Sequence, residues 1–301
     1  MDVLPRGLTL PIYTVDAFAD VPFSGNQAAV VPVPEDVELS ESIMQMLAAE
    51  MNYAETSFVK QLPGGGDFKN GEKFGLRWFT PTSEVPLCGH ATLAAAAALF
   101  NEIGNVNETV EFQTRYSGSL FSRRSGETIT IDLPVNKTAR EGTEGFDELI
   151  EILTCGKDVQ DLAWNATLPM LLIRLSDALS RQEFESFQPD IRKAEGATDR
   201  TKMVVVTMKA RSGAGFEDRD GRTFDFVSRF FAPWFGVDED SVTGAAHTVL
   251  ADYWSRELKK NEMYARQCSQ RGGNVGLKVR ESGRVELTGK GLVIVRGTIS
   301  F

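Results

Sequence analysis

The chain has 301 residues, of which 42% are hydrophobic and 25% charged, a globular composition that excludes collagen-like, coiled-coil and wholly disordered proteins. Its formal net charge of −10 opposes binding to nucleic acid, whose phosphates are negative. No apolar segment approaches the length that crosses a membrane, and the segment up to Phe18 lacks the apolar core of a signal peptide, so we expect a cytoplasmic protein.

The first half of the chain is predicted to be mostly β-strand. Segments of strand length that are rich in Val, Ile and Phe occupy residues 8–15, 28–33, 56–61, 76–79, 109–113 and 128–133. In the last of these, Ile129, Ile131 and Leu133 alternate with polar residues, the period of two that one buried sheet face produces. Short connections favour antiparallel pairing of these strands.

Two helices are predicted among these strands. Residues 40–51 have apolar side chains at helical spacing, and Ser40 is available as the N-cap. Residues 91–100 are almost entirely apolar, so that helix should be buried on all sides.

The polar segment 135–145 is the predicted boundary between two domains, 1–134 and 135–301. The sequence leaves open whether the last strand packs with the second domain or returns to the first. Beyond the boundary we expect strands at 170–175, 203–209 and 223–231, a helix at 243–258, and three short strands at 275–279, 285–288 and 292–299. The predicted fold class is α+β, with two similar domains that each have a mainly antiparallel, barrel-like sheet around a central helix.

The two halves share a local sequence pattern. RWFTP at 77–81 precedes CGHAT at 88–92, and RFFAP at 229–233 precedes TGAAH at 243–247. We interpret the pattern as an internal duplication, with chance similarity of two strand-to-helix turns as the alternative. In a duplication each central helix would begin at a glycine turn, where backbone N–H groups can bind an anion.

Three polar residues lie where chemistry could be carried out. Glu55 stands between a predicted helix and an apolar strand, and a partly buried carboxyl group is suited to general acid–base catalysis. An ordinary loop glutamate would have the same local sequence. His90 and Asp240 flank the starts of the two central helices; the alternatives are a structural histidine and a helix cap.

Cys88 precedes the first central helix, and a thiol beside a helix N-terminus is expected to have a lowered pKa. Cys88, Cys155 and Cys268 are an odd, scattered set without a Cys-x-x-Cys pair, so neither a disulfide framework nor a zinc site is predicted. The Gly64–Gly66 run lacks the Lys-Ser/Thr of a P-loop, and no Gly-x-Gly-x-x-Gly turn follows a strand. We therefore expect no metal and no nucleotide cofactor.

The chain resembles the PhzF family of phenazine biosynthesis-like proteins over nearly its whole length. The resemblance is carried by DAF at 16–18 with GN at 25–26, MNYAET at 51–56, EVPLCGHAT at 84–92, EDSVTGAAH at 239–247 and QRGG at 270–273. It implies the diaminopimelate-epimerase-like fold, with the active site between two similar domains, and a homodimer.

The resemblance also implies an isomerase that works without a metal or an organic cofactor. In the family a glutamate at the position of Glu55 moves a proton between carbons of a small cyclic amino acid, assisted by residues that match His90 and Asp240. The implied substrate-binding positions, which would hold a carboxylate, are Asn26, Cys88, Gly89, Ser241, Gly244, Ala245, Arg271, Gly272 and Gly273.

One departure bears on this function. The family pattern Asp-Pro-Val-Thr-Gly-Ser reads DSVTGA here at 240–245, so the hydroxyl expected at Ala245 is absent, and Ser241 offers a hydroxyl four positions earlier. The alternatives are therefore a noncatalytic binding or scaffold protein that retains the fold, and a cysteine-dependent epimerase based on Cys88. An epimerase of this kind would use two thiols, and no cysteine lies between residues 240 and 245.

Overall fold

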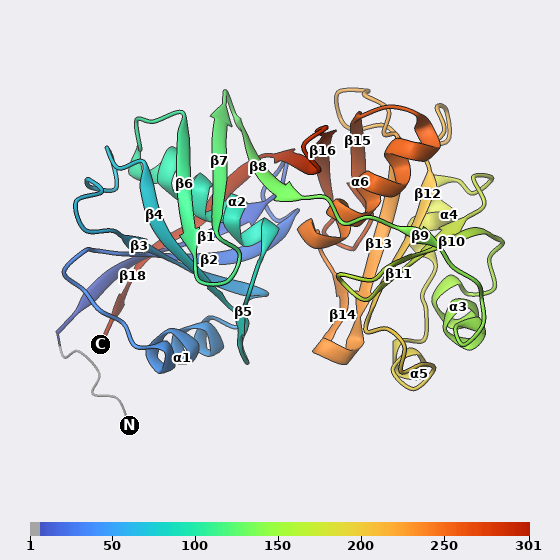
Figure 1. The fold of residues 1–301 in the computed structure, drawn as a ribbon, viewed down its shortest axis with the longest axis horizontal. Coiled ribbons are helices and arrows are strands. Elements are labelled where there is room, and N and C mark those ends of the chain that lie inside the picture. Colours follow the sequence, from blue (N-terminus) through green and yellow to red (C-terminus); the bar gives the residue numbers. More distant parts are fainter. Residues whose placement is uncertain (1–6) are drawn as a thin grey trace. The chain divides into compact units, whose positions relative to one another are not determined.

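The computed structural model describes residues 7–301; the first six residues, part of the segment considered for a signal peptide, lie outside the description. By its contacts the chain divides into two units (Figure 1). One holds the residues up to Leu133 together with Leu287–Phe301, and the other holds Pro134–Glu286. The last strand thus packs with the first unit, which is the return that the sequence left open.

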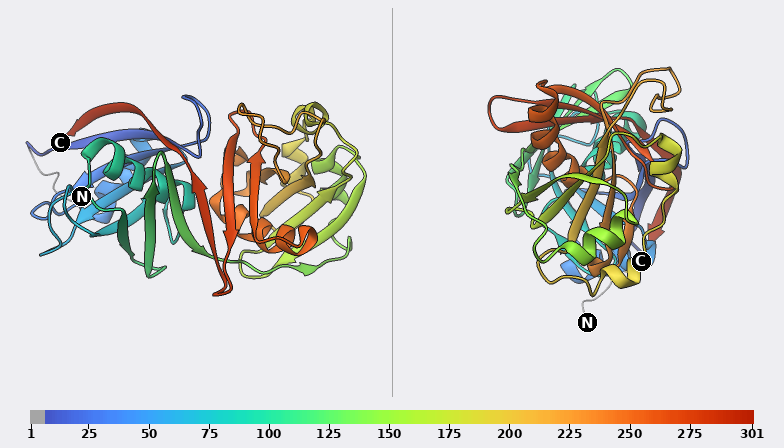
Figure 2. Two further views of the ribbon diagram at one scale, coloured as in Figure 1. Left: turned by 90° about the horizontal axis from the view of Figure 1, so that it is seen from above. Right: turned by 90° about the vertical axis from the view of Figure 1, so that its right-hand side faces the viewer.

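The first unit is mainly β-sheet. Its strands are β1 (Thr9–Ala17), β2 (Asn26–Val33), β3 (Glu55–Gln61), β4 (Lys73–Phe79), β5 (Glu84–Val85), β6 (Thr109–Thr114), β7 (Ser119–Ser125), β8 (Thr128–Pro134) and β18 (Gly291–Ser300). Its helices are α1 (Glu41–Met51) and α2 (Gly89–Ala97), and α2 continues as the π-helical segment η1 (Ala98–Ile103). β18 runs antiparallel beside β1, as Figure 2 shows.

The second unit has the same kind of construction. Its strands are β9 (Ala139–Arg140), β10 (Val159–Asn165), β11 (Met170–Leu175), β12 (Met203–Lys209), β13 (Phe226–Ala232), β14 (Val237–Asp240), β15 (Glu262–Gln267) and β16 (Gly273–Val279), and β17 (Arg284–Gly289) spans the boundary. Its helices are α3 (Asp147–Thr154), α4 (Arg181–Ser186), α5 (Ile191–Ala194) and α6 (Gly244–Leu258), with the short 3-10 turn η2 (Pro233–Phe235).

The strand order of the first unit repeats in the second. β1 to β5, α2, β6 and β7 correspond in order to β10 to β14, α6, β15 and β16. The pairings also match: β2–β3 and β11–β12 are parallel, as are β4–β6 and β13–β15, whereas the pairs flanking them are antiparallel. The shared sequence pattern therefore accompanies a repeated topology, and the sheets are mainly antiparallel with two parallel pairings in each unit.

Each unit surrounds one helix with strands (Figure 1). Every residue of α2 is buried, and its small alanines permit close approach of the sheet: a Cβ on Gly291 of β18 would lie 2.5 Å from the Cβ of Ala97. In the second unit Trp254 of α6 stacks on Phe226 at 5.4 Å and donates from Nε1 to Oγ1 of Thr207. Both predicted central helices are confirmed.

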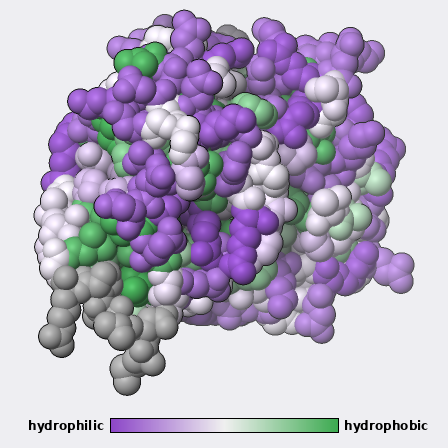
Figure 3. Space-filling view, turned by 60° about the vertical axis from the view of Figure 1, so that its left-hand side comes forward, coloured by the Kyte–Doolittle hydropathy of each residue, from purple (hydrophilic) through white to green (hydrophobic). Residues whose placement is uncertain are grey.

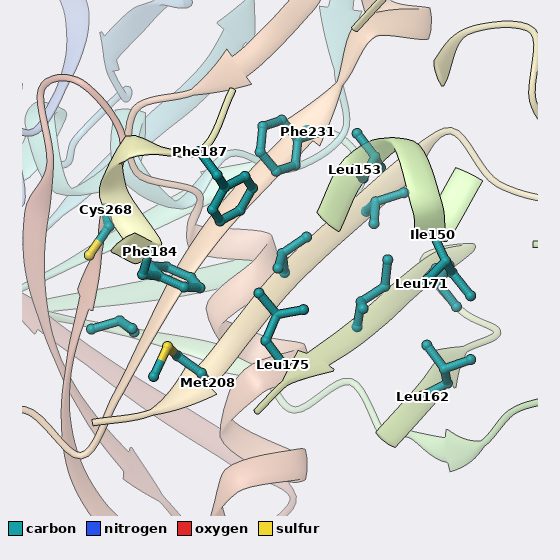
Figure 4. Packing of buried hydrophobic residues seen from close by; sticks show 14 of the residues in the cluster. Ile150, Leu153, Leu162, Leu171, Leu175, Phe184, Phe187, Met208, Phe231 and Cys268 are labelled. Atoms are coloured by element: carbon teal, nitrogen blue, oxygen red, sulfur yellow. The ribbon is translucent and has the colours of Figure 1, made fainter. Parts of the chain in front are cut away.

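A hydrophobic cluster of the Pro134–Glu286 unit lies between α3, α4 and strands β10 to β13 (Figure 4). Its aromatic members include Phe146, Phe184, Phe187 and Phe231. The prediction missed most elements between residues 135 and 201, because they are short and their apolar residues, such as Leu149 and Leu162, come together only in this cluster.

The face drawn in Figure 3 is largely hydrophilic, with hydrophobic residues in smaller groups. Among the described residues, no helix is both long and apolar enough to cross a membrane.

Candidate active site

Glu55 is positioned by the end of α1 and the start of β3. Asn52 caps α1 in the left-handed conformation (φ 50°) and turns the chain back. Glu55 then opens β3, in parallel register with Ala28 of β2. Its side chain is 17% exposed, so the carboxylate is partly buried, as the sequence predicts.

His90 is the second residue of α2 and is buried. Its Nε2 lies 2.9 Å from Oε2 of Glu55. The two atoms are in ion-pair contact, but the contact does not have the direction of a hydrogen bond, and neither atom has a hydrogen-bond partner among the described residues. Since buried polar atoms are rarely left unbonded, both atoms are suited to bonding with a ligand.

The opposite ring nitrogen of His90 faces two side chains. Its Nδ1 lies 3.3 Å from Nδ2 of Asn26 and 3.5 Å from Sγ of Cys88. Asn26 is the buried first residue of β2, and it follows Gly25, where a Cβ would lie only 2.2 Å from the carbonyl oxygen of Ala17. The DAF and GN motifs thus form the tight β1–β2 connection that brings Asn26 to His90.

The pKa directions of this cluster follow from burial and charge. Burial alone would lower the pKa of His90, but the neighbouring Cys88 and the Glu55 carboxylate raise it, and the net pKa lies well above the usual 6.5. Burial, followed by the charge of Glu55, raises the pKa of the Cys88 thiol. The predicted lowering of the Cys88 pKa is therefore wrong, because loss of hydration outweighs the helix N-terminus.

Cys88 is the N-cap of α2, but its side chain makes no capping hydrogen bond. Gly89 is the first residue of the helix, so the N–H groups of the first turn have no intrahelical partner. The start of α2 therefore presents backbone donors and the positive end of the helix dipole beside the Glu55–His90 pair.

The second unit holds the other predicted polar residues in a loop that leads into α6. The Asp240 carboxylate accepts hydrogen bonds from the N–H of Ser241 at 2.9 Å and from Oγ1 of Thr243 at 2.5 Å. Thr243, not Asp240, is the N-cap of α6, and its side chain makes no capping bond either. Gly244 and Ala245 begin the helix, and Ala245 offers no hydroxyl there.

The β15–β16 turn supports this loop. The Gln267 side chain accepts from the N–H of Thr243 and donates to the carbonyl of Asp240, both at 2.8 Å. Oγ of Ser269 donates to the carbonyl of Ser241 and accepts from the N–H of Gly272. Sequence reasoning missed Gln267, Thr243 and Ser269, because these contacts join segments that are 24 and 28 residues apart along the chain.

The three remaining predicted substrate-binding positions, at residues 271–273, lie at the β15–β16 turn. Arg271 is half-buried in the turn, and Gly273 begins β16 opposite Gln267. Gly272 has a positive φ of 63°, and a Cβ there would lie 2.2 Å from Nη2 of Arg266, so this turn requires glycine.

The two halves of the repeat carry different chemistry. The element starts align Glu55 with Met203 at the first position of β3 and β12, and the helix starts align Cys88-Gly89-His90 with Thr243-Gly244-Ala245. The carboxylate, thiol and imidazole therefore occur together in the first unit, whereas the equivalent residues of the second are Met, Thr and Ala.

His247, the other histidine of the chain, is fully buried in α6, and burial lowers its pKa to about 4. Since a carbonyl oxygen can only accept, Nδ1 carries the proton and donates to the carbonyl of Thr243 at 2.8 Å. We assign it to stabilisation of the first turn of α6.

Comparison with known proteins agrees with this architecture. A family model described as "Phenazine biosynthesis-like protein" matches residues 15–297. The chain belongs to this phenazine biosynthesis-like family. The human phenazine biosynthesis-like domain-containing protein is 43% identical, over 97% of this chain and 100% of its own. A protein of Pseudomonas aeruginosa named an uncharacterized isomerase is 37% identical, over 97% and 99%.

Solved structures give the same result. The crystal structure of a PhzF family protein from Enterococcus faecalis covers 98% of this chain and 100% of its own, with 33% identity and a TM-score of 0.82. A hydroxyproline epimerase from Agrobacterium vitis matches with a TM-score of 0.54 at 10% identity, over 97% of this chain and 93% of its own, which shows the fold alone. The fold is that of the PhzF and epimerase-like isomerases, as the sequence predicts.

Proposed function

We propose that this protein is an isomerase that moves a proton between carbons of a small, cyclic amino-carboxylate substrate, without a metal or an organic cofactor. The observation that carries the proposal is the 2.9 Å contact between Oε2 of Glu55 and Nε2 of His90, both buried atoms without a hydrogen-bond partner. Named isomerases among the relatives support this reaction class.

In the proposed reaction the Glu55 carboxylate removes a proton from one carbon of the substrate and returns it to another. The carbon–hydrogen electron pair moves into the conjugated system between the two carbons, so nothing is oxidised or reduced. His90, whose pKa is raised well above its usual value, supplies a positive charge that stabilises the anionic intermediate.

The substrate carboxylate would be held by backbone N–H groups at Gly89, which starts a helix that lacks a side-chain cap. Gly244 starts the equivalent helix of the other unit, also without a side-chain cap. The loop of Asp240 keeps its hydrogen bonds to Ser241 and Thr243 without a hydroxyl at Ala245. The departure from the family pattern therefore bears on substrate positioning and leaves the proton-transfer groups of the first unit in place.

The test is incorporation of solvent deuterium into a panel of cyclic and acyclic amino acids, followed by NMR. Glu55→Gln retains the size of the side chain but removes the base, and should reduce exchange by at least about 100-fold. Glu127→Gln is the control, because Glu127 lies in the same unit with 82% of its side chain exposed. Equal exchange in the wild type and Glu55→Gln would refute the mechanism.

The second candidate is a noncatalytic binding protein, which the missing hydroxyl at Ala245 favours. It predicts ligand binding without exchange in the wild type. A cysteine-dependent epimerase is opposed by the raised pKa of Cys88 and by Thr243, which takes the place of a second thiol in the repeat.

A further inference from the structure

Three metal-ligating side chains converge at the start of α2. One ligand atom from each of Glu55, Cys88 and His90 can be chosen so that all three lie within 4.8 Å of one another. The three side chains are a carboxylate, a thiol and an imidazole, which are the three kinds of ligand that bind Zn²⁺ in proteins. The sequence did not predict this set, because Glu55 is more than thirty residues from the other two and only β3 brings it to α2.

The spacing of the three groups is within about 1 Å of that of a tetrahedral site. With metal–ligand bonds of about 2.0–2.3 Å, neighbouring ligand atoms are about 3.3–3.8 Å apart. The 2.9 Å contact with Glu55 is made by Nε2 of His90, whereas the 3.5 Å contact with Cys88 is made by Nδ1. A single cation can bind only one of these nitrogens, and with one ligand atom from each residue the three atoms lie within 4.8 Å of one another. Rotamer adjustments of about 1 Å would therefore place a cation between the three side chains, with the fourth position open to water or another ligand.

Burial and bonding favour a cation here. Nε2 of His90 and Oε2 of Glu55 are buried without a hydrogen-bond partner among the described residues, and His90 is only 4% exposed. A bound cation would satisfy both atoms and replace part of the hydration that they lose. The partial exposure of Glu55 provides a route of entry from solvent.

The other ring nitrogen of His90 also has a partner close by. If Nε2 of His90 binds the metal, Nδ1 carries a proton and needs an acceptor. Asn26 lies 3.3 Å away, and rotation of its amide would present Oδ1 to that proton, since amide orientation is a matter of the hydrogen-bond network.

We propose that Glu55, Cys88 and His90 bind Zn²⁺ reversibly, and that the bound cation excludes substrate and blocks proton transfer. Binding forms a Zn–S bond as the Cys88 thiol loses its proton to the buffer, and His90 loses a proton when it starts as the imidazolium, so no electron is transferred. The binding itself stands on the geometry of the three side chains; the blocking of proton transfer rests on the proposed function.

The experiment uses the purified full-length chain, first freed of metal by a chelator, and Co²⁺ as the probe for Zn²⁺. Co²⁺ bound to a thiolate gives a charge-transfer absorption that reports the Cys88 ligand directly. We expect saturable binding with this absorption, displacement of Co²⁺ by Zn²⁺, and an apparent affinity that rises with pH because protons are released.

Variants assign the site. Cys88→Ser should abolish the charge-transfer absorption. Glu55→Gln should weaken binding by at least about tenfold, since even loss of a group that only orients a metal ligand costs about 10–100-fold. Cys155→Ser is the control, because Cys155 is exposed and lies in the other unit, and it should bind as the wild type does. Cys88→Ala is a second variant if Cys88→Ser does not fold, as circular dichroism would show.

The outcomes separate the two proposals. Three outcomes would overturn the metal site. The absorption could persist in both Cys88 variants, it could be lost in Cys155→Ser, or the wild type could show no saturable binding. Saturable binding lost with Cys88 in a protein without deuterium exchange would support the site and contradict the proposed isomerase. Binding that leaves exchange unchanged would refute the claim that Zn²⁺ blocks proton transfer.

Discussion

Two arginine–glutamate pairs occupy equivalent places in the repeat. Arg229 on β13 donates to both carboxylate oxygens of Glu239 at 2.7 and 2.8 Å, and Arg77 on β4 donates to both of Glu84 at the same distances. Each glutamate lies four residues before the N-cap of the central helix. The pairs therefore fix the two loops that lead into α2 and α6.

The two pairs should differ in their contribution to stability. Arg229 is only 3% exposed and also donates to the carbonyl of Phe187, so Arg229→Met leaves several buried acceptors without a donor. Breaking a buried pair costs about 3–5 kcal/mol. Because Glu239 is 22% exposed, water can reach its carboxylate, so we expect Arg229→Met to lower the free energy of unfolding by about 3 kcal/mol, the low end of this range.

Arg77→Met should cost only about 1 kcal/mol. The Arg77 side chain is 25% exposed. The Glu84 carboxylate is only 9% exposed, but Arg115 also lies 3.0 Å from it, so a cation remains beside the glutamate. Urea denaturation measures the difference of about 2 kcal/mol between the two variants, and hydrogen exchange with mass spectrometry assigns the loss to β13–β14 or to β4–β5.

The double variant Arg229→Met/Glu239→Gln tests the cause. It should recover part of the stability lost in Arg229→Met, since it removes the uncompensated charge. An Arg77→Met cost equal to or above that of Arg229→Met would refute the reasoning from burial and from the second cation at Glu84.

Two further predictions concern the site. His90 has its folded-state pKa raised well above 6.5, so its ionisation stabilises the fold below about pH 6.5 and that contribution is lost as pH rises through the folded-state value. The stability difference between the wild type and His90→Gln, from urea denaturation at several pH values, should therefore fall as pH rises, and a difference that grows would contradict this. Gly272→Ala should lower the free energy of unfolding by about 1 kcal/mol more than Gly283→Ala does. Both glycines have positive φ, but of the two only Gly272 would place a Cβ against the guanidinium of Arg266, which donates to Asn274. Equal thermal denaturation of the two variants would show that the contact is relieved without cost.

Much of this protein was determined by local sequence. The alternation at Ile129 and Ile131 predicts the half-buried strand β8, and the alanine-rich run after His90 predicts the buried helix α2. The repeated pattern around Gly89 and Gly244 predicts two equivalent helix starts, because such starts depend on residues within one turn of each other. Family motifs identified Glu55, His90 and Asp240 as candidates.

The tertiary structure alone decided the chemistry of those candidates. The ion-pair contact of Glu55 with His90 depends on the pairing of β2 with β3 and on the packing of α2 inside the sheet. The pKa of Cys88 rises rather than falls because burial, a property of the whole fold, outweighs the local helix dipole. The bonding of Gln267 to the Thr243 loop likewise requires strands that are separated along the chain. Patterns within a few residues specify elements, whereas burial and long-range contact set the charge and reach of a side chain.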